Sequence, residues 1–214
     1  MRGVSKRKAN PLIDSRAVRI AREALEEVGE GGIGKQGFAR LMKLWTEDAR
    51  ALCTGQPPLG TLEPEMVRQP ANLTITCGLG ERIFSLLGVD KPKWLGDVRA
   101  YSRDQLDDKW GQTDIVLQIC SDDPLMNTYA LRHMVRSGEH YAEVSWLQQG
   151  FINAYGSHEK GATARNMFGQ KDGTVNPRGD EQFADQVWIE DGPKWQQGGA
   201  AMVVRRIRMN LDTW

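Results

Sequence analysis

The chain has 214 residues, a mass of 24.0 kDa, 40% hydrophobic residues and no formal net charge at pH 7. This length allows one large domain or two small ones, and the composition is sufficient for a hydrophobic core. A neutral chain lacks the overall positive charge with which proteins bind nucleic acids or anionic membrane surfaces, so we expect neither as a partner.

The N-terminal segment, residues 1–34, is predicted to be poorly ordered and basic. Seven of the first 22 residues are Lys or Arg, and Asp14 is the only acid among them. An export signal needs an uninterrupted apolar stretch of about 7 to 15 residues, but polar residues break up 9–22. No stretch of the chain reaches the roughly 18 apolar residues of a membrane span. We therefore expect no membrane span and, for the chain as given, a cytoplasmic location.

The first ordered half is predicted to cover residues 35–155 and to begin with an amphipathic helix. Apolar side chains recur on one face of 35–53 at helical spacing. Alternating apolar residues predict a strand over 72–80, and a short helix follows at 81–87. No strand is expected before the first helix, because Arg16–Val28 lacks a strand-like pattern.

The rest of this half is predicted to form a strand, a helix and a second strand. Residues 114–121 are an apolar run of the kind found in buried strands. Asp123 is a suitable N-cap, and Pro124 fits the first turn of a helix over 125–137. Large side chains make 141–151 strand-like.

The second half is predicted to cover residues 165–214. It contains a glycine-rich loop, a short strand at 187–189 and a final strand at 200–209. Helices and strands alternate along the whole chain without short βαβ spacing, which favours an α+β fold with antiparallel sheets.

The three cysteines, Cys53, Cys77 and Cys120, are an odd number without Cys-x-x-Cys spacing. This pattern argues against a zinc site or a disulfide framework. Cys77 and Cys120 lie in apolar runs, where a thiol acts as a small hydrophobic side chain.

The most informative feature of the chain is the run Gly169–Val175, which is followed by Asn176 and Pro177. Two glycines in it bracket a lysine and an aspartate. Such a loop brings bare backbone close to a ligand and presents one carboxylate, that of Asp172, to it. The same composition is also common in ordinary turns, so the loop has to be interpreted with the rest of the chain.

Four segments, taken in order, resemble the dye-decolourising (DyP-type) haem peroxidases, and within them the exported group that includes deferrochelatase/peroxidase. These segments are 72–80, 114–123, 146–151 and 169–177. The most specific element is the Gly-x-x-Asp-Gly motif, in which Gly169, Asp172 and Gly173 match. The resemblance implies a dimeric α/β-barrel type of fold with two ferredoxin-like halves and antiparallel sheets. The second half is expected to be incomplete here, and the chain to be truncated at both ends.

The resemblance also implies a cofactor, substrates and site residues. Haem b is the expected cofactor, and hydrogen peroxide with dye-like or phenolic reductants are the expected substrates. Asp172 is the expected distal acid–base group, because peroxide cleavage needs a proton moved from one oxygen to the other. Gly173, Thr174 and Val175 are expected to lie against the haem, and a side chain at Gly173 would collide with the porphyrin.

The family holds haem iron through a histidine well downstream of this motif, a position expected to lie beyond Trp214. The three histidines of the chain do not match it, so no metal ligand is assigned. We expect His133 on the solvent face of its helix, and His140 and His158 in turns or loops. The family usually has an aromatic residue where this chain has Gln170, which puts the position of the loop in question.

Three functions therefore remain open. The leading hypothesis is a haem peroxidase that oxidises dye-like or phenolic compounds or removes iron from haem during iron uptake. The alternative is a truncated, non-catalytic remnant that acts as a binding or pairing module. The third is a generic ferredoxin-like binding domain without affinity for haem. For an incomplete chain, missing strands would expose apolar sheet surface, so we expect a homo-oligomer.

Overall fold

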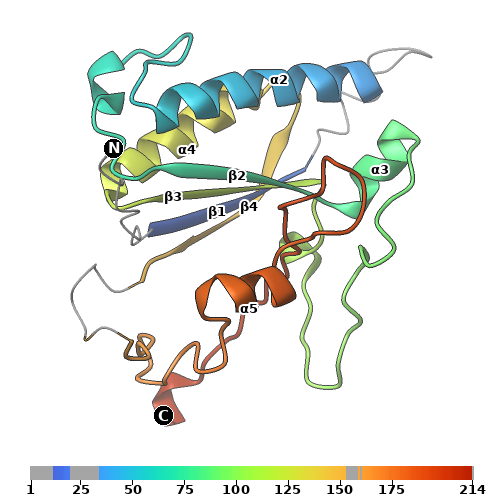
Figure 1. The fold of residues 1–214 in the computed structure, drawn as a ribbon, viewed down its shortest axis with the longest axis vertical. Coiled ribbons are helices and arrows are strands. Elements are labelled where there is room, and N and C mark those ends of the chain that lie inside the picture. Colours follow the sequence, from blue (N-terminus) through green and yellow to red (C-terminus); the bar gives the residue numbers. More distant parts are fainter. Residues whose placement is uncertain (1–11, 20–33, 153–158, 160, 214) are drawn as a thin grey trace. The chain divides into compact units, whose positions relative to one another are not determined.

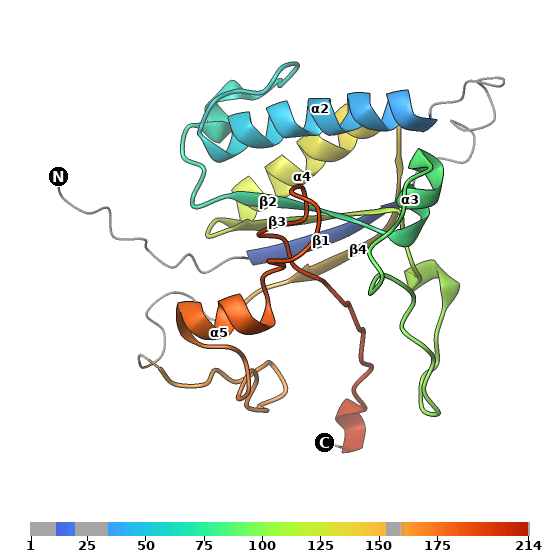
Figure 2. The ribbon, with the colours of Figure 1, turned by 45° about the vertical axis from the view of Figure 1, so that its right-hand side comes forward.

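The computed structural model describes the backbone of residues 12–19, and residues 34–152, 159 and 161–213. The chain divides into two compact units, Met1–His158 and Glu159–Trp214. The first unit contains an antiparallel sheet, and its two long helices both lie over one face of that sheet (Figures 1 and 2).

The first unit follows the strand–helix–strand–strand–helix–strand order of a ferredoxin-like fold. In chain order its elements are β1 (Leu12–Arg19), α2 (Gly34–Cys53), η1 (Pro64–Val67), β2 (Thr74–Leu79), α3 (Glu81–Leu87), η2 (Asp108–Trp110), β3 (Ile115–Ser121), α4 (Pro124–Gly138) and β4 (Glu143–Gly150). The sheet order is β2-β3-β1-β4, and all three neighbouring pairs are antiparallel. The predicted α+β fold class with an antiparallel sheet is confirmed.

The strand β1 corrects one expectation, namely that no strand precedes the first helix; the rest of the segment 1–34, for which poor order was predicted, lies outside the described residues apart from Gly34. Leu12–Arg19 pairs with β3 on one side and with β4 on the other, so it lies in the centre of the sheet. Asp14, Arg16 and Arg19 interrupt the apolar pattern by which a strand is recognised. The hydrogen bonds between strands are made by the backbone, however. Neighbouring strands can therefore hold a segment as a strand even when its side chains lack a strand-like pattern.

The hydrophobic core lies between the sheet and the two helices. On β3 every second side chain is buried toward the helices: Ile115, Leu117 and Ile119. The side of α2 that meets them carries Leu41, Trp45 and Leu52, as the helical spacing predicted. The α4 contribution is Met126, Tyr129, Ala130, Leu131 and Met134.

Two local signals are confirmed at the ends of elements. The side chain of Asp123 accepts a hydrogen bond from the backbone N–H of Leu125 at 2.9 Å, so it caps α4 as predicted. At the start of β3, Arg82 of α3 donates two hydrogen bonds to the buried carboxylate of Asp114, each 2.6 Å long. This contact ties α3 to the sheet, and the bonded carboxylate raises the pKa of Arg82.

Trp45 holds α2 against α4. Its indole Nε1 donates a hydrogen bond to the backbone oxygen of Met134 at 2.9 Å. The ring also lies directly over Gly138, where an added Cβ would be 2.7 Å from Cζ2 of Trp45. The helices can approach this closely only because residue 138 has no side chain.

The second unit has less regular structure than predicted. Its described residues include one α-helix, α5 (Gly179–Gln186), and a short 3-10 turn, η3 (Leu211–Thr213). The helix was missed, although Asp180 and Glu181 lie in its first turn, where acidic residues favour a helix start.

The predicted strands at 187–189 and 200–209 are wrong for the described structure. The backbone N–H groups of Val187 and Trp188 bond to Phe183 and end α5, and Ile189 makes only two backbone hydrogen bonds with 198–199. Residues 200–210 have no assigned helix, strand or turn. A β-type composition becomes a strand only when a partner strand satisfies its backbone.

Within the part of the chain that the structure describes, no helix has the length and apolarity to cross a membrane.

The close approach at Trp45 yields a stability test. Replacing Gly138 by Ala should lower the free energy of unfolding by about 1–3 kcal/mol, because the new methyl group overlaps the indole ring. The matched control is Gly34→Ala, at the start of α2, where no atom lies within 4 Å of the added Cβ. Urea unfolding should show the control within about 1 kcal/mol of the parent; an equal loss in both variants would contradict the packing argument.

Candidate functional site

The predicted motif loop is part of a tight β-hairpin in the second unit. Arg165 and Lys171 form an isolated antiparallel bridge, and the N–H of Asp172 donates to the oxygen of Ala164 at 2.9 Å. On the turn side, the N–H of Asn166 donates to the oxygen of Gln170 at 2.9 Å. These contacts determine which residue lies opposite Asp172.

The tip of the hairpin, Asn166–Gln170, is closed by side chains as well as backbone. The Oδ1 atom of Asn166 accepts from the N–H of Phe168 at 3.0 Å and from that of Gln170 at 3.1 Å. Gly169 has a φ of +79°, a left-handed conformation that glycine adopts without strain. Arg165 also donates a hydrogen bond to the oxygen of Gly169.

A second turn begins immediately after Asp172. Gly173 has a φ of +83°, and its oxygen accepts a hydrogen bond from the N–H of Asn176 at 3.2 Å. A Cβ at Gly173 would lie 2.5 Å from Nδ2 of Asn176, so a side chain there would displace that of Asn176, and the positive φ would strain it. Asp172 is thus held between a hairpin and a glycine turn.

The surface next to this turn combines a carboxylate with apolar area. Asp172 and Thr174 are exposed, and Val175 is 91% exposed. Among the described residues, the Asp172 carboxylate has no hydrogen-bond or ion-pair partner. A bare glycine backbone, an exposed valine and a free carboxylate suit a flat, largely apolar ligand with a reactive centre, and haem has that chemistry.

The second unit contains no histidine, and His158 lies outside the described residues. No cluster of His, Cys, Asp or Glu within the described part of the chain is arranged to hold a metal ion. Asp172, Gly173, Thr174 and Val175 would therefore contact haem on one side of the ring only.

His133 is placed differently from its prediction. Instead of facing solvent it is 8% exposed, and its Nε2 lies 3.3 Å from Oδ2 of Asp48 on α2. That distance allows an ion pair, but neither atom has a hydrogen bond of good geometry to another described residue. The prediction failed because α4 buries a broad face that includes His133. The spacing of Asp48 with Leu41, Trp45 and Leu52 was the available signal for a buried contact here.

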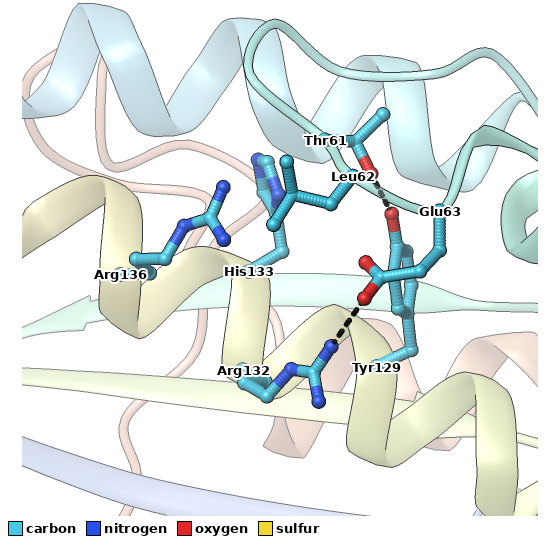
Figure 3. Close-up of a pocket in the computed structure, with 7 residues that line it drawn as sticks. All are labelled: Thr61, Leu62, Glu63, Tyr129, Arg132, His133 and Arg136. Carbon is cyan, nitrogen blue, oxygen red and sulfur yellow. Dashed lines mark hydrogen bonds and ion pairs between the residues drawn. The ribbon is translucent and has the colours of Figure 1, made fainter.

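Figure 3 shows the pocket beside His133, between α4 and the loop that carries Thr61, Leu62 and Glu63. Tyr129 hydrogen-bonds Thr61, and Arg132 donates to Glu63 at 3.0 Å, so the loop is fastened over α4. The cavity measures ≈ 20 Å³, room for about one water molecule. His133 thus lines a space far too small for a porphyrin.

Two family models match the chain in succession. The model described as Dyp-type peroxidase, N-terminal, matches residues 32–152, and the model described as Dyp-type peroxidase, C-terminal, matches residues 163–214. The first matched region holds α2 to β4 of the first unit, without β1, and the second holds the hairpin with Asp172.

Curated relatives with similar sequences include a dye-decolorizing peroxidase of Thermobifida fusca and a deferrochelatase of Yersinia pestis. The first is 32% identical over 207 residues, which are 91% of this chain and 48% of the relative. The second is 34% identical over 200 residues, 84% of this chain and 46% of the relative. The chain spans about half the length of these proteins.

Solved structures of DyP-type peroxidases are also similar to this chain. A DyP-type peroxidase from Cellulomonas bogoriensis superposes with a TM-score of 0.85 at 36% identity, over 99% of this chain and 57% of that one. A DyP-type peroxidase from Streptomyces coelicolor superposes with a TM-score of 0.75 at 30% identity, over 92% of this chain and 52% of that one.

The position of His133 predicts a structural role that a comparison of a single and a double variant can measure. His133→Leu should lower the free energy of unfolding by about 2–4 kcal/mol, because it leaves Asp48 buried opposite an apolar side chain. The double variant Asp48→Ala/His133→Leu nearly conserves volume and removes both polar groups. It should be more stable than His133→Leu alone in urea unfolding.

A double variant no more stable than the single variant would contradict this pairing. Hemin affinity gives an independent check, since a structural histidine predicts equal affinity in the parent and in His133→Leu.

Proposed function

Because the chain belongs to the Dyp-type peroxidase family, we propose that it takes part in haem-dependent oxidation by hydrogen peroxide. The observation that carries the proposal is the exposed carboxylate of Asp172, held between the hairpin and the glycine turn. Haem, when bound, supplies the redox chemistry. The residues of this chain would form the surface against which haem lies and would transfer the proton.

Asp172 acts in this proposal as an acid–base group. A carboxylate oxygen would take a proton from one oxygen of hydrogen peroxide and deliver it to the other, so that this second oxygen can leave as water when the O–O bond breaks. Bound haem would supply the two electrons and retain the remaining oxygen atom. The backbone N–H of Asp172 is engaged with Ala164, so the residue is anchored while its side chain remains free to exchange protons.

Gly173, Thr174 and Val175 form the wall on which the ring would lie. The backbone at Gly173 can approach a planar group closely, since no Cβ intervenes. Val175 is the most exposed apolar side chain of this turn, and covering it would remove apolar surface from water.

For the finer specificity we propose haem b as the group and small aromatic compounds as the reductants. The similarity to a protein called dye-decolorizing peroxidase, from Thermobifida fusca, supports the proposed reductants. Removal of iron from haem is the second candidate activity. It is favoured by the similarity to proteins called deferrochelatase, of which the Yersinia pestis protein is 34% identical over 200 residues.

Replacing Asp172 by Asn tests the acid–base role. The amide has nearly the same shape but cannot accept and return the proton, so peroxide turnover of the haem-loaded protein should fall by about 10²–10⁴-fold. Hemin affinity, measured by titration at the Soret band, should be unchanged. The matched control is Asp185→Asn on α5, an exposed aspartate for which full turnover is expected.

The outcomes separate two failures. If hemin gives no saturable binding to the parent chain, the haem proposal is wrong for this chain. If hemin binds but Asp172→Asn turns over peroxide like the parent, Asp172 has no part in the proton transfer.

A further inference from the structure

The orientation of Asp172 depends on the register of its hairpin. Successive residues of a hairpin arm point to opposite faces, so a slip of one residue would turn the Asp172 side chain to the other face. The backbone bond from Asp172 to Ala164 exists only in the observed register. Whatever fixes the turn at the tip therefore also fixes the face from which the carboxylate projects.

Asn166 and Gln170 are joined across that turn by three hydrogen bonds. The N–H of Asn166 donates to the oxygen of Gln170 at 2.9 Å, and the N–H of Gln170 donates to Oδ1 of Asn166 at 3.1 Å. In addition, Nδ2 of Asn166 donates to Oε1 of Gln170 at 3.1 Å. A second N–H, that of Phe168, donates to the same Oδ1 atom at 3.0 Å.

This pattern leaves little freedom in how the two amides are oriented. Oδ1 of Asn166 receives two backbone donors, so its Nδ2 is the group that faces Gln170. The only complementary atom on the Gln170 side chain is its carbonyl oxygen. A side chain of Asn that bonds nearby backbone N–H groups imitates a backbone turn and stabilises one turn geometry over its alternatives.

We propose that Asn166 and Gln170 are positioning residues for Asp172, acting as an amide clamp that holds the hairpin in one register. The catalytic side of this inference rests on the proposed function, and the structural side stands without it. Gln170, which departs from the aromatic residue expected at this place in the motif, acquires a specific partner in Asn166. The motif in this chain is held by hydrogen bonds at its tip.

Three variants test the clamp. Asn166→Ala removes the whole side-chain contribution, Gln170→Met removes only the contact between the two amides, and Gln170→Glu keeps an oxygen that can accept from Asn166. The control is Gln186→Ala on α5, an exposed glutamine outside the hairpin.

The first readout is hydrogen exchange of the Asp172 backbone N–H, followed by NMR in the full chain. Exchange should accelerate about ten-fold or more in Asn166→Ala, and by a smaller factor in Gln170→Met, because opening of the hairpin becomes easier. Gln170→Glu and Gln186→Ala should exchange at the parent rate. Unchanged exchange in Asn166→Ala would overturn the clamp, whether or not the protein is a peroxidase.

The second readout separates positioning from mere stability. In the haem-loaded protein, Asn166→Ala and Gln170→Met should lose about ten-fold in kcat for peroxide with hemin affinity unchanged. Gln170→Glu, which keeps the accepting oxygen, should have the same kcat as the parent. Faster exchange with an unchanged kcat would overturn the positioning role, and a parent protein without turnover would overturn the proposed function while leaving the exchange result valid.

Discussion

The backbone pairing of β1 is the constraint on which the first unit depends. Leu12–Arg19 hydrogen-bonds to β3 along one edge and to β4 along the other. Without it, β2 and β3 would form a two-stranded ribbon, which is marginally stable in water, and β4 would have no neighbour. Because β1 separates β3 from β4, the chain must cross over it between them, and that crossing carries α4 alongside α2 (Figure 1). The contact of Trp45 with Gly138 and the burial of His133 beside Asp48 both follow from this placement.

The two units use different means to hold their important residues. In the first, apolar side chains from two helices and a sheet enclose one another, and the buried polar pair at the helix interface is a structural consequence. In the second, few large side chains are buried, and the Asp172 loop is held by short-range hydrogen bonds and two left-handed glycines, Gly169 and Gly173. A loop of that kind can present bare backbone and a carboxylate to a planar ligand, which a packed helix surface cannot do.

Much of the fold was predictable because apolar periodicity is strong in α2, α3 and β3. The family resemblance, inferred from four segments of which the most specific contains Asp172, was confirmed by the models that match both parts of the chain. The failures have a common physical cause. The strand β1 is recognisable only through its partners, the run 200–209 lacks such a partner among the described residues, and the burial of His133 depends on how α2 meets α4. The contact between Asn166 and Gln170 could not be predicted from the sequence either, because it depends on the geometry of the turn.

The central claim is that haem lies against the loop that carries Asp172, and paramagnetic broadening of NMR signals measures this most directly. Ferric hemin added to the isotopically labelled chain should broaden the backbone signals of Gly173, Thr174 and Val175 in proportion to occupancy. The signal of Leu41, a buried core residue on α2, is the reference for broadening that is not selective. Broadening centred on His133, or no selective broadening at all, would contradict the account.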